Sequence, residues 1–318
     1  MGAKLREVRR RIRSVQSTMK ITRAMELIAT SRIMKAQERV EQSRPYSERL
    51  TAAITDVASV SAVPGIDLLE ERPDPKAAAV FVVTSDRGLA GAYNANVLRV
   101  AEELFSKLRS EGKETRLFVS GRKGISYYRF RGRDIEDSWT GFSETPRYEH
   151  AKEIADALIQ RFTDRDVDEI HGVYTDFQST MRQKPVARRF VPMVFEEVDR
   201  PEDQRGPTNQ YIFEPEPGAL LEALLPRYIE TRVFNALLES AASEHAARRR
   251  AMAAATDNAD DLIKVLTRVA NQARQTEITT EIMEIVGGAE ALRKMGAGPA
   301  SAPSGSREAE TEPATPVG

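Results

Sequence analysis

The stretch with the clearest potential for chemistry is TSDRGLAGAYN at residues 84–94. It follows an apolar run and precedes a helical pattern, which is where α/β proteins place a turn that binds phosphate. The spacing of Gly88 and Gly91 does not match the dinucleotide fingerprint, and no Gly-Lys-Ser/Thr follows as in a P-loop. We therefore interpret the stretch as a tight structural turn, with nucleotide binding as the weaker alternative.

Two further clusters carry weaker signals. Residues 121–129 mix basic and aromatic side chains that could contact RNA, but no RNA-binding module surrounds them. Four acidic residues in a predicted helix-to-strand loop lack the spacing of a metal-binding loop and are interpreted as solvated charge: Asp164, Asp166, Asp168 and Glu169. The chain has no cysteine and only three histidines, far apart in sequence, which argues against thiolate chemistry and His-based metal sites. No catalytic constellation emerges, and no cofactor or metal is expected in this chain.

The charge and hydropathy pattern limits the remaining classes. A net charge of −1 argues against a uniformly basic nucleic-acid binder. No apolar run reaches the roughly 18 residues of a membrane span, and the basic N-terminus lacks the apolar core of a secretory signal, so we expect a cytoplasmic protein. Residues 1–35 carry ten Lys or Arg against two Glu. This is either a solvated helix face or a basic shaft that faces an acidic partner.

The elements that would position these residues are dominated by a long helix near the C-terminus. After Pro217 at its start, the stretch 217–294 holds one proline, Pro226, in its first turns and no glycine between Gly218 and Gly287, which predicts a helix about 110 Å long. Its second half contains apolar residues at steps of three and four, the spacing of a coiled-coil seam. The predicted seam consists of Met252, Ala255, Ala259, Leu262, Leu266, Val269 and Ala273.

A second long helix is predicted at residues 3–60. Its seam begins with Leu5, Val8, Ile12, Val15, Met19 and Thr22, and then shifts to Ile21, Met25 and Ile28 as a stutter would do. We expect Pro45 to bend or interrupt this helix. Because each long helix has a narrow apolar seam, the simplest way to bury both is an antiparallel pair.

Between the two helices the pattern alternates between strands and helices, which predicts an α/β layer with a largely parallel sheet. The predicted strands are residues 77–84, 116–120, 134–139, 169–175 and 190–195, and the predicted helices are residues 94–110, 123–130 and 148–162. Residues 61–75 are predicted as a linker, residues 197–207 as a loop and residues 295–318 as a disordered tail.

Several motifs, in one order along residues 1–294, resemble the gamma subunits of F-type rotary ATP synthases. GAKLREVRRRIRSVQ at 2–16 and KITRAMELIA at 20–29 resemble the opening helix of that family, and TSDRGLAGAYN at 84–94 resembles its central-domain motif. Three further segments resemble the closing helix of that family: SEHAARRRAM at 243–252, ATDN at 255–258 and NQARQTEITTEIMEIVGG at 271–288. The resemblance implies a central rotor stalk inside a ring of three alpha and three beta subunits, standing on the membrane c-ring beside the epsilon subunit.

The resemblance also implies roles for individual residues. Met25 matches the position that faces an acidic lever of a beta subunit. Four residues match positions on the closing helix that engage the ring: Arg248, Arg274, Gln275 and Thr279. Tyr211 and Glu214 match the foot that meets the c-ring and epsilon. ATP, ADP and Mg²⁺ would be bound by the alpha and beta subunits, and neither nucleic acid nor a small-molecule substrate would be bound by this chain.

The predicted fold is thus α/β plus a long antiparallel two-helix coiled coil. Its parts are an N-terminal coiled-coil helix at 1–60, a linker at 61–75, a central Rossmann-like α/β domain at 76–210, a C-terminal coiled-coil helix at 211–294 and the tail at 295–318. The predicted function is that of a non-catalytic, peripheral subunit on the cytoplasmic face of a bacterial membrane. A static coiled-coil scaffold with an α/β head is the alternative, and an enzyme built on the α/β layer is less favoured.

Overall fold

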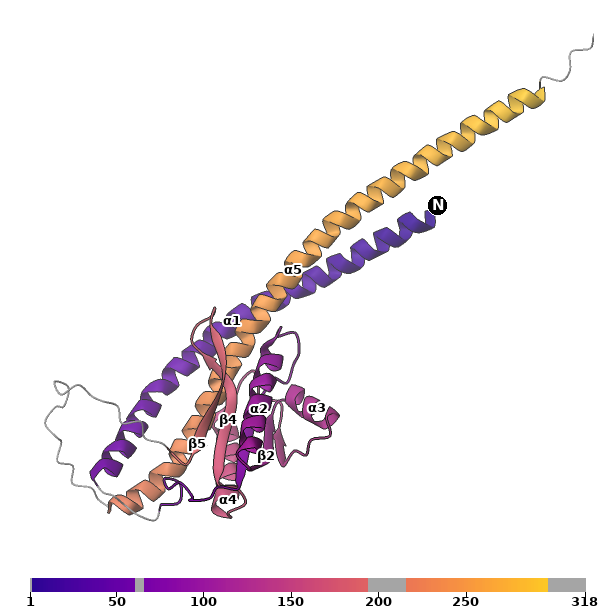
Figure 1. Ribbon diagram of the computed structural model, residues 1–318. Helices are drawn as coiled ribbons and strands as arrows, with labels where there is room; N and C mark the ends of the chain where they lie inside the picture. Colours follow the sequence, from indigo (N-terminus) through magenta and orange to yellow (C-terminus); the bar gives the residue numbers. More distant parts are fainter. Residues whose placement is uncertain (1, 61–65, 194–215, 297–318) are drawn as a thin grey trace, which may run out of the picture. The chain divides into compact units, whose positions relative to one another are not determined.

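The computed structural model describes residues 2–60, 66–193 and 216–296 (Figure 1). The predicted loop at 197–207, the first part of the predicted linker (61–65) and nearly all of the predicted tail lie outside these residues. The elements in chain order are α1 (Gly2–Val60), β1 (Ala77–Val83), α2 (Tyr93–Ser110), β2 (Glu114–Ser120), α3 (Arg122–Phe130), β3 (Asp137–Trp139), α4 (Tyr148–Thr163), β4 (Glu169–Phe177), β5 (Gln183–Val191) and α5 (Pro217–Gly296).

The chain divides into two compact units, and each has its own contacts. The larger unit comprises residues 18–259 and contains the sheet, α2, α3, α4 and the adjoining parts of the two long helices. The smaller unit comprises residues 1–17 and 260–318, that is, the beginning of α1 and the end of α5. None of the described helices contains a stretch long and apolar enough to cross a membrane.

The sheet has five strands in the order β3-β2-β1-β4-β5. Strand β1 pairs in parallel with β2 and with β4, β2 pairs in parallel with β3, and β4 pairs antiparallel with β5. The prediction of a largely parallel sheet is therefore confirmed. The prediction of a strand at 190–195 was wrong in its bounds, because β5 starts at Gln183. The charged, partly exposed residues of β5 hide the strand pattern in the sequence.

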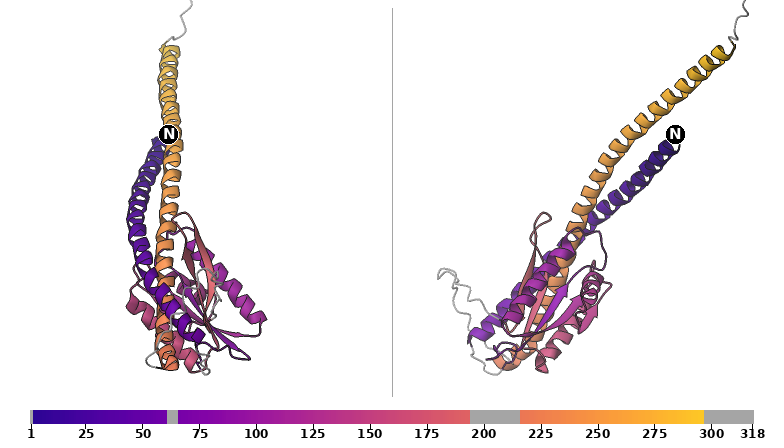
Figure 2. Two further views of the ribbon diagram at one scale, coloured as in Figure 1. Left: turned by 90° about the vertical axis from the view of Figure 1, so that its left-hand side faces the viewer. Right: turned by 45° about the vertical axis from the view of Figure 1, so that its right-hand side comes forward.

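Helices cover both faces of the sheet (Figure 2). Alternate residues of β1 point to opposite faces: Val80 and Val82 pack in one apolar cluster with α2 and α3, whereas Phe81 packs in another with α4 and α5. Burial on both faces explains why β1 is a continuous apolar run with no polar alternation. The second cluster includes Ile229 and Val233 of α5, so the long C-terminal helix is part of the core of the larger unit.

Within the larger unit, α1 and α5 run antiparallel. Ile54 of α1 packs in one apolar cluster with Leu225 of α5, and Val40 packs in another with Leu238. Still nearer the start of α1, the hydroxyl oxygens of Thr22 and Thr256 lie 2.8 Å apart and share a hydrogen bond. Successively earlier residues of α1 thus contact successively later residues of α5, so the two helices run in opposite directions, as predicted.

The predicted stutter in α1 is wrong. Ile21 and Ile28 are 58% and 54% exposed, whereas Ala29 and Ile33 are buried. From Leu5 to Val57, the less exposed positions follow one unbroken alternation of three and four residues through Thr22, Ala29, Ile33, Ala36, Val40, Leu50 and Ile54. The apolar residues outside this series lie on the outer surface of the helix and do not belong to a shifted seam.

The seam of α5 is also partly displaced from its prediction. Met252 and Ala259 are buried as expected, but Leu262 and Val269 are exposed. The less exposed positions are Thr256, Ile263 and Ala270, each one residue later than the predicted Ala255, Leu262 and Val269. The pattern was ambiguous because apolar residues occupy both 262 and 263 and both 269 and 270.

Neither Pro45 nor the pair Gly287-Gly288 interrupts its helix. α1 continues through Pro45 and α5 continues through Gly287 and Gly288 to its end at Gly296. An internal proline costs about 3 kcal/mol in a helix. We attribute the continuity at Pro45 to the buried contacts that follow it, in which Leu50, Ile54 and Val57 pack with Leu221 and Leu225.

Candidate functional site

The turn at residues 84–94 is built around the carboxylate of Asp86, at the edge of the sheet where β1, β2 and β3 end. Its Oδ2 accepts hydrogen bonds from the backbone N–H groups of Gly141 at 2.8 Å and Ser143 at 3.1 Å, and its Oδ1 accepts one from Arg122 at 3.2 Å. Backbone N–H groups at this edge are what an α/β protein offers to a phosphate. Here the chain's own carboxylate takes them, which agrees with a structural turn.

Neighbouring residues hold this turn against the next strand. Thr84 Oγ1 donates to the carbonyl of Ser120 at 2.8 Å and accepts from the N–H of Gly124 at 2.9 Å. Gly121 has a φ of 98°, and a Cβ there would lie 2.2 Å from the carbonyl oxygen of Thr84. Glycine at 121 is therefore required both by the backbone conformation and by the closeness of the two chain segments.

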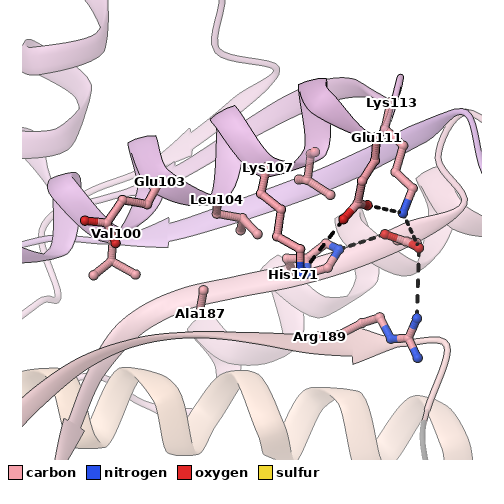
Figure 3. Close-up of a pocket in the computed structure, with 11 residues that line it drawn as sticks. Val100, Glu103, Leu104, Lys107, Glu111, Lys113, His171, Ala187 and Arg189 are labelled. Carbon is pink, nitrogen blue, oxygen red and sulfur yellow. Dashed lines mark hydrogen bonds and ion pairs between the residues drawn. The ribbon is translucent and has the colours of Figure 1, made fainter.

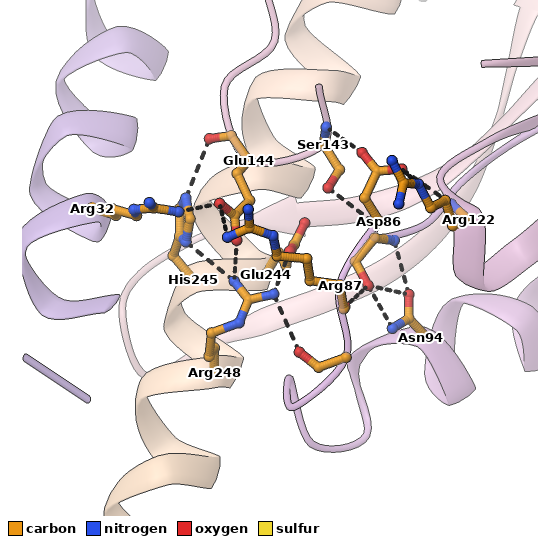
Figure 4. Close-up of polar contacts among 12 residues, drawn as sticks. Arg32, Asp86, Arg87, Asn94, Arg122, Ser143, Glu144, Glu244, His245 and Arg248 are labelled. Carbon is orange, nitrogen blue, oxygen red and sulfur yellow. Dashed lines mark hydrogen bonds and ion pairs between the residues drawn. The ribbon is translucent and has the colours of Figure 1, made fainter. Parts of the chain in front are cut away.

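Beside this turn, polar side chains join the sheet to both long helices, and we call them the polar junction (Figure 4). The junction comprises Arg32 of α1, Arg87 of the 84–94 turn, Glu144 of the loop after β3, and Glu244, His245 and Arg248 of α5. The Glu144 carboxylate pairs with three arginines from three segments: Arg32 through a short contact, Arg87 at 3.5 Å and Arg248 at 3.3 Å.

The part of the junction on α5 is deeply buried. Arg248 is 5% exposed and Glu244 is 1% exposed. Arg248 Nη2 lies 2.6 Å from Glu244 Oε1 and also donates to the carbonyl of Gly88 at 3.4 Å. Burial raises the pKa of Glu244, while the charge of Arg248 and its hydrogen bond act in the opposite direction. Arg248 therefore compensates two carboxylates, that of Glu244 on its own helix and that of Glu144 in the loop after β3.

His245 has a defined protonation state in the junction. Its Nε2 lies 3.2 Å from the carbonyl oxygen of Glu144, which can only accept, and its Nδ1 lies 3.4 Å from Arg248 Nη1, which can only donate. His245 is therefore neutral, with its hydrogen on Nε2. Burial lowers its pKa to about 4, and the charge of Arg248 acts in the same direction.

A second charged cluster lies at the opposite edge of the sheet, where β2 and β4 begin (Figure 3). Glu169 Oε1 lies 2.8 Å from Lys113 Nζ and Glu169 Oε2 lies 2.9 Å from His171 Nε2. These hydrogen bonds, that from His171 foremost, hold the pKa of Glu169 at about 2 against the opposing effect of burial. The prediction that Glu169 is merely solvated charge was wrong.

Asp168 is also structural. Its carboxylate forms an ion pair with Arg72 at 2.7 Å and accepts hydrogen bonds from the backbone N–H groups of Lys76 and Ala77, so it holds the start of β1 in place. Among the described residues, no group of three or more His, Cys, Asp or Glu is arranged to hold a metal ion.

The residues assigned roles by resemblance are distributed over both units. Met25 is half-buried on α1, close to Thr22, whereas Arg248 lies in the polar junction. In the smaller unit, Arg274, Gln275 and Thr279 are exposed on α5. Gln275 and Thr279 are one turn apart on one face of the helix, and the Thr279 hydroxyl donates to the Gln275 carbonyl at 2.9 Å. Tyr211 and Glu214 lie outside the described residues.

The structure brings together two motifs that the sequence analysis treated separately, the 84–94 turn and the 243–252 segment. The missed residues are Glu144 and Arg32. Arg32 and Glu144 are 112 positions apart, and no local pattern marks either one. The burial of the charged side chains of Glu244 and Arg248 could be found only from coordinates.

Comparisons with known proteins give a consistent result. The ATP synthase family matches residues 4–292. The chain is 56% identical over 306 residues to the ATP synthase gamma chain of Mycolicibacterium vanbaalenii and 59% identical over 296 residues to that of Frankia casuarinae. In both cases the match covers 92% of this chain and 99% of the relative.

Solved structures of similar fold include two from the Euglena gracilis mitochondrial ATP synthase. The assembly of OSCP, F1 and c-ring contains a chain with a TM-score of 0.64 and 17% identity, covering 96% of this chain and 99% of that chain. The rotor contains one with a TM-score of 0.62 and 16% identity, covering 87% of this chain and all of that one. At such identities the likeness concerns the fold.

Proposed function

The chain belongs to the ATP synthase gamma-chain family, and from this premise we propose how it works as the central stalk of a rotary ATP synthase. The observation that carries this role is the match along nearly the whole length of both α1 and α5. In that role the chain couples rotation of a membrane c-ring to conformational changes at catalytic sites on other subunits. Each orientation of the stalk would favour a different conformation of each surrounding subunit.

The two long helices would serve as the shaft. We propose that α1 and α5 form an antiparallel coiled coil and that the sheet with its helices is a Rossmann-like domain at its base. The heptad spacing of the less exposed positions in α1 and α5 supports this arrangement. Two paired helices are stiffer than one, and their unequal lengths, Gly2–Val60 and Pro217–Gly296, make the shaft asymmetric. Asymmetry is necessary, because a three-fold shaft would act equally on three catalytic sites.

The proposed partners follow from this role. Three alpha and three beta subunits would surround the shaft, and the epsilon subunit and the c-ring would contact its base. Met25, Arg274, Gln275 and Thr279 are partly or fully exposed, and we propose that they contact the alpha/beta ring directly. For the buried Arg248 we propose an effect through the position of α5. Tyr211 and Glu214 are proposed to form the foot that contacts the c-ring and epsilon.

Chemistry would take place on the partners. We propose that ATP, ADP and Mg²⁺ are bound by the alpha and beta subunits, that this chain has no catalytic site of its own, and that it is a peripheral subunit at the cytoplasmic face of a bacterial membrane. The Asp86 carboxylate supports this division of roles, because it takes the backbone donors that a nucleotide phosphate would use in an α/β protein.

Co-purification tests the proposal. The chain is expressed with the alpha and beta subunits of its own enzyme, and the subunit ratio and ATPase activity of the isolated complex are measured. We expect one copy of this chain for every three alpha and three beta subunits. A homodimer of this chain that does not associate with the ATPase subunits would instead support a static scaffold.

A further inference from the structure

The polar junction lies near the end of the stretch over which α5 contacts the sheet. Earlier in α5, Ile229, Val233 and Leu237 belong to the apolar cluster of the sheet. Beyond the junction, Arg250 still donates to the carbonyl of Thr180 between β4 and β5, at 3.0 Å. The junction is therefore placed close to where α5 leaves the support of the α/β elements.

Apolar packing restrains the rotation of a helix about its own axis less sharply than directional contacts do, because the hydrophobic effect is non-directional. Charge-assisted hydrogen bonds depend on direction and are stronger than neutral ones. Glu144 supplies such contacts to both helices at once, through Arg32 of α1 and Arg248 of α5. Its carboxylate thus forms ion pairs with both long helices.

The three arginine contacts differ in strength. The Arg248 side chain is 6% exposed and is shielded from water and salt, whereas the Arg87 side chain is 71% exposed and is screened. Arg32 is intermediate between them. The contacts that should resist a load are therefore those of Glu144 with Arg248 and with Arg32, one on each helix.

We propose that Glu144 is a positioning residue for rotary coupling, which holds α1 and α5 at a fixed angle to the α/β elements while the stalk is under torsional load. This proposal rests on the stalk function proposed above. Without the Glu144 charge, both helices would rotate more easily relative to the α/β elements. Part of each rotational step would then twist the stalk instead of being transmitted along it. Coupling would then weaken before catalysis itself did.

The test uses Glu144→Gln in the complete ATP synthase, reconstituted into vesicles. Glutamine keeps the shape of the side chain, but it removes the charge and presents an amide N–H₂ to guanidinium donors. We expect protons pumped per ATP hydrolysed to fall at least about twofold, the lower end of effects for residues that couple distant sites. ATP hydrolysis itself should change less. Glu103→Gln is the matched control, because Glu103 makes only an exposed pair with Arg99 within α2.

A second variant covers the case in which Glu144→Gln does not assemble into the complete enzyme. Arg32→Gln removes only the α1 contact, and we expect it to lower the pumping ratio in the same direction. The double variant should be no worse than Glu144→Gln alone, because Arg32 acts through Glu144. If Glu144→Gln fails to assemble, Arg32→Gln decides the matter. An unchanged ratio in an assembled variant, or proportional losses of pumping and hydrolysis, would overturn the proposal. Failure of the parent chain to support ATP-driven pumping would instead refute the stalk function.

Discussion

Glu239 offers a quantitative test of the packing between the sheet and the long helices. Its side chain lies beside Tyr174 of β4 and Arg188 of β5, and its Oε2 atom is buried with no hydrogen-bond partner among the described residues. Burial, reinforced by the charge of Asp176, raises the pKa of Glu239 from 4.5 to about 7, although Arg188 and Arg232 act in the opposite direction. The ionised carboxylate therefore destabilises the folded chain.

The sign of the pH dependence follows from this shift. Because the folded state binds the proton more tightly than the unfolded state, stability falls as the pH rises from about 4.5 to about 7 and then levels off. The rise of the Glu239 pKa from 4.5 to about 7 corresponds to about 3 kcal/mol. Glu239→Gln removes the titration, so the stability of the variant relative to the parent should increase by about 2.5 kcal/mol between about pH 5 and pH 8.

Urea unfolding followed by tryptophan fluorescence measures this difference. The single tryptophan, Trp139, is buried in the same apolar cluster as Ile229 and Val233 of α5, so its emission reports on the relevant packing. Glu284→Gln, at an exposed position of the same helix, is the control and should leave the pH dependence unchanged. Parallel stability curves for the parent and Glu239→Gln across this pH range would refute the reasoning.

Two further substitutions test the fold and the coupling contacts. In Gly172→Ala, the new Cβ would lie 2.2 Å from the ring of Phe190, so we expect a loss of about 1–3 kcal/mol in the free energy of unfolding, measured in the same urea assay. Gly287→Ala, where a Cβ would meet open space outside its own helix, should not lower stability. Equal effects of the two substitutions would contradict this. We proposed that Met25 contacts the alpha/beta ring, at an acidic segment of a beta subunit. On that proposal, the ammonium group added by Met25→Lys should lower the number of protons pumped per ATP more than it lowers ATP hydrolysis, both measured in vesicles. Equal losses would count against this contact.

The sequence predicted the elements well where one period dominates. The start of α1 was placed correctly because Leu5 to Met19 alternate in steps of three and four without competing apolar residues. The prediction failed at Ile21 and Ile28, which are apolar but exposed, because periodicity shows which residues are apolar and not which face is covered. In α5, the buried Thr256 was passed over for Ala255. Its hydroxyl is satisfied by Thr22 and by the carbonyl of Met252, so a polar residue is tolerated in the seam.

The candidate site was only partly accessible from sequence. The 84–94 turn and the placement of Arg248 in a functional segment were predicted, but the partners of Arg248 were not. Glu144 lies in a loop between β3 and α4, and its contacts to Arg32 and Arg248 join segments distant in sequence. Such pairings depend on the folded arrangement of the sheet and both long helices, and no local spacing encodes them.

Rotation of the chain inside its complex is the most direct test of the central claim. The sequence contains no cysteine, so Phe130→Cys, at a position of α3 that is 92% exposed, provides one specific attachment point for an optical probe. With the alpha and beta subunits fixed to a surface, ATP should drive continued rotation of the probe in one direction. ATP hydrolysis by a complex that contains the labelled chain in a fixed orientation would contradict the account.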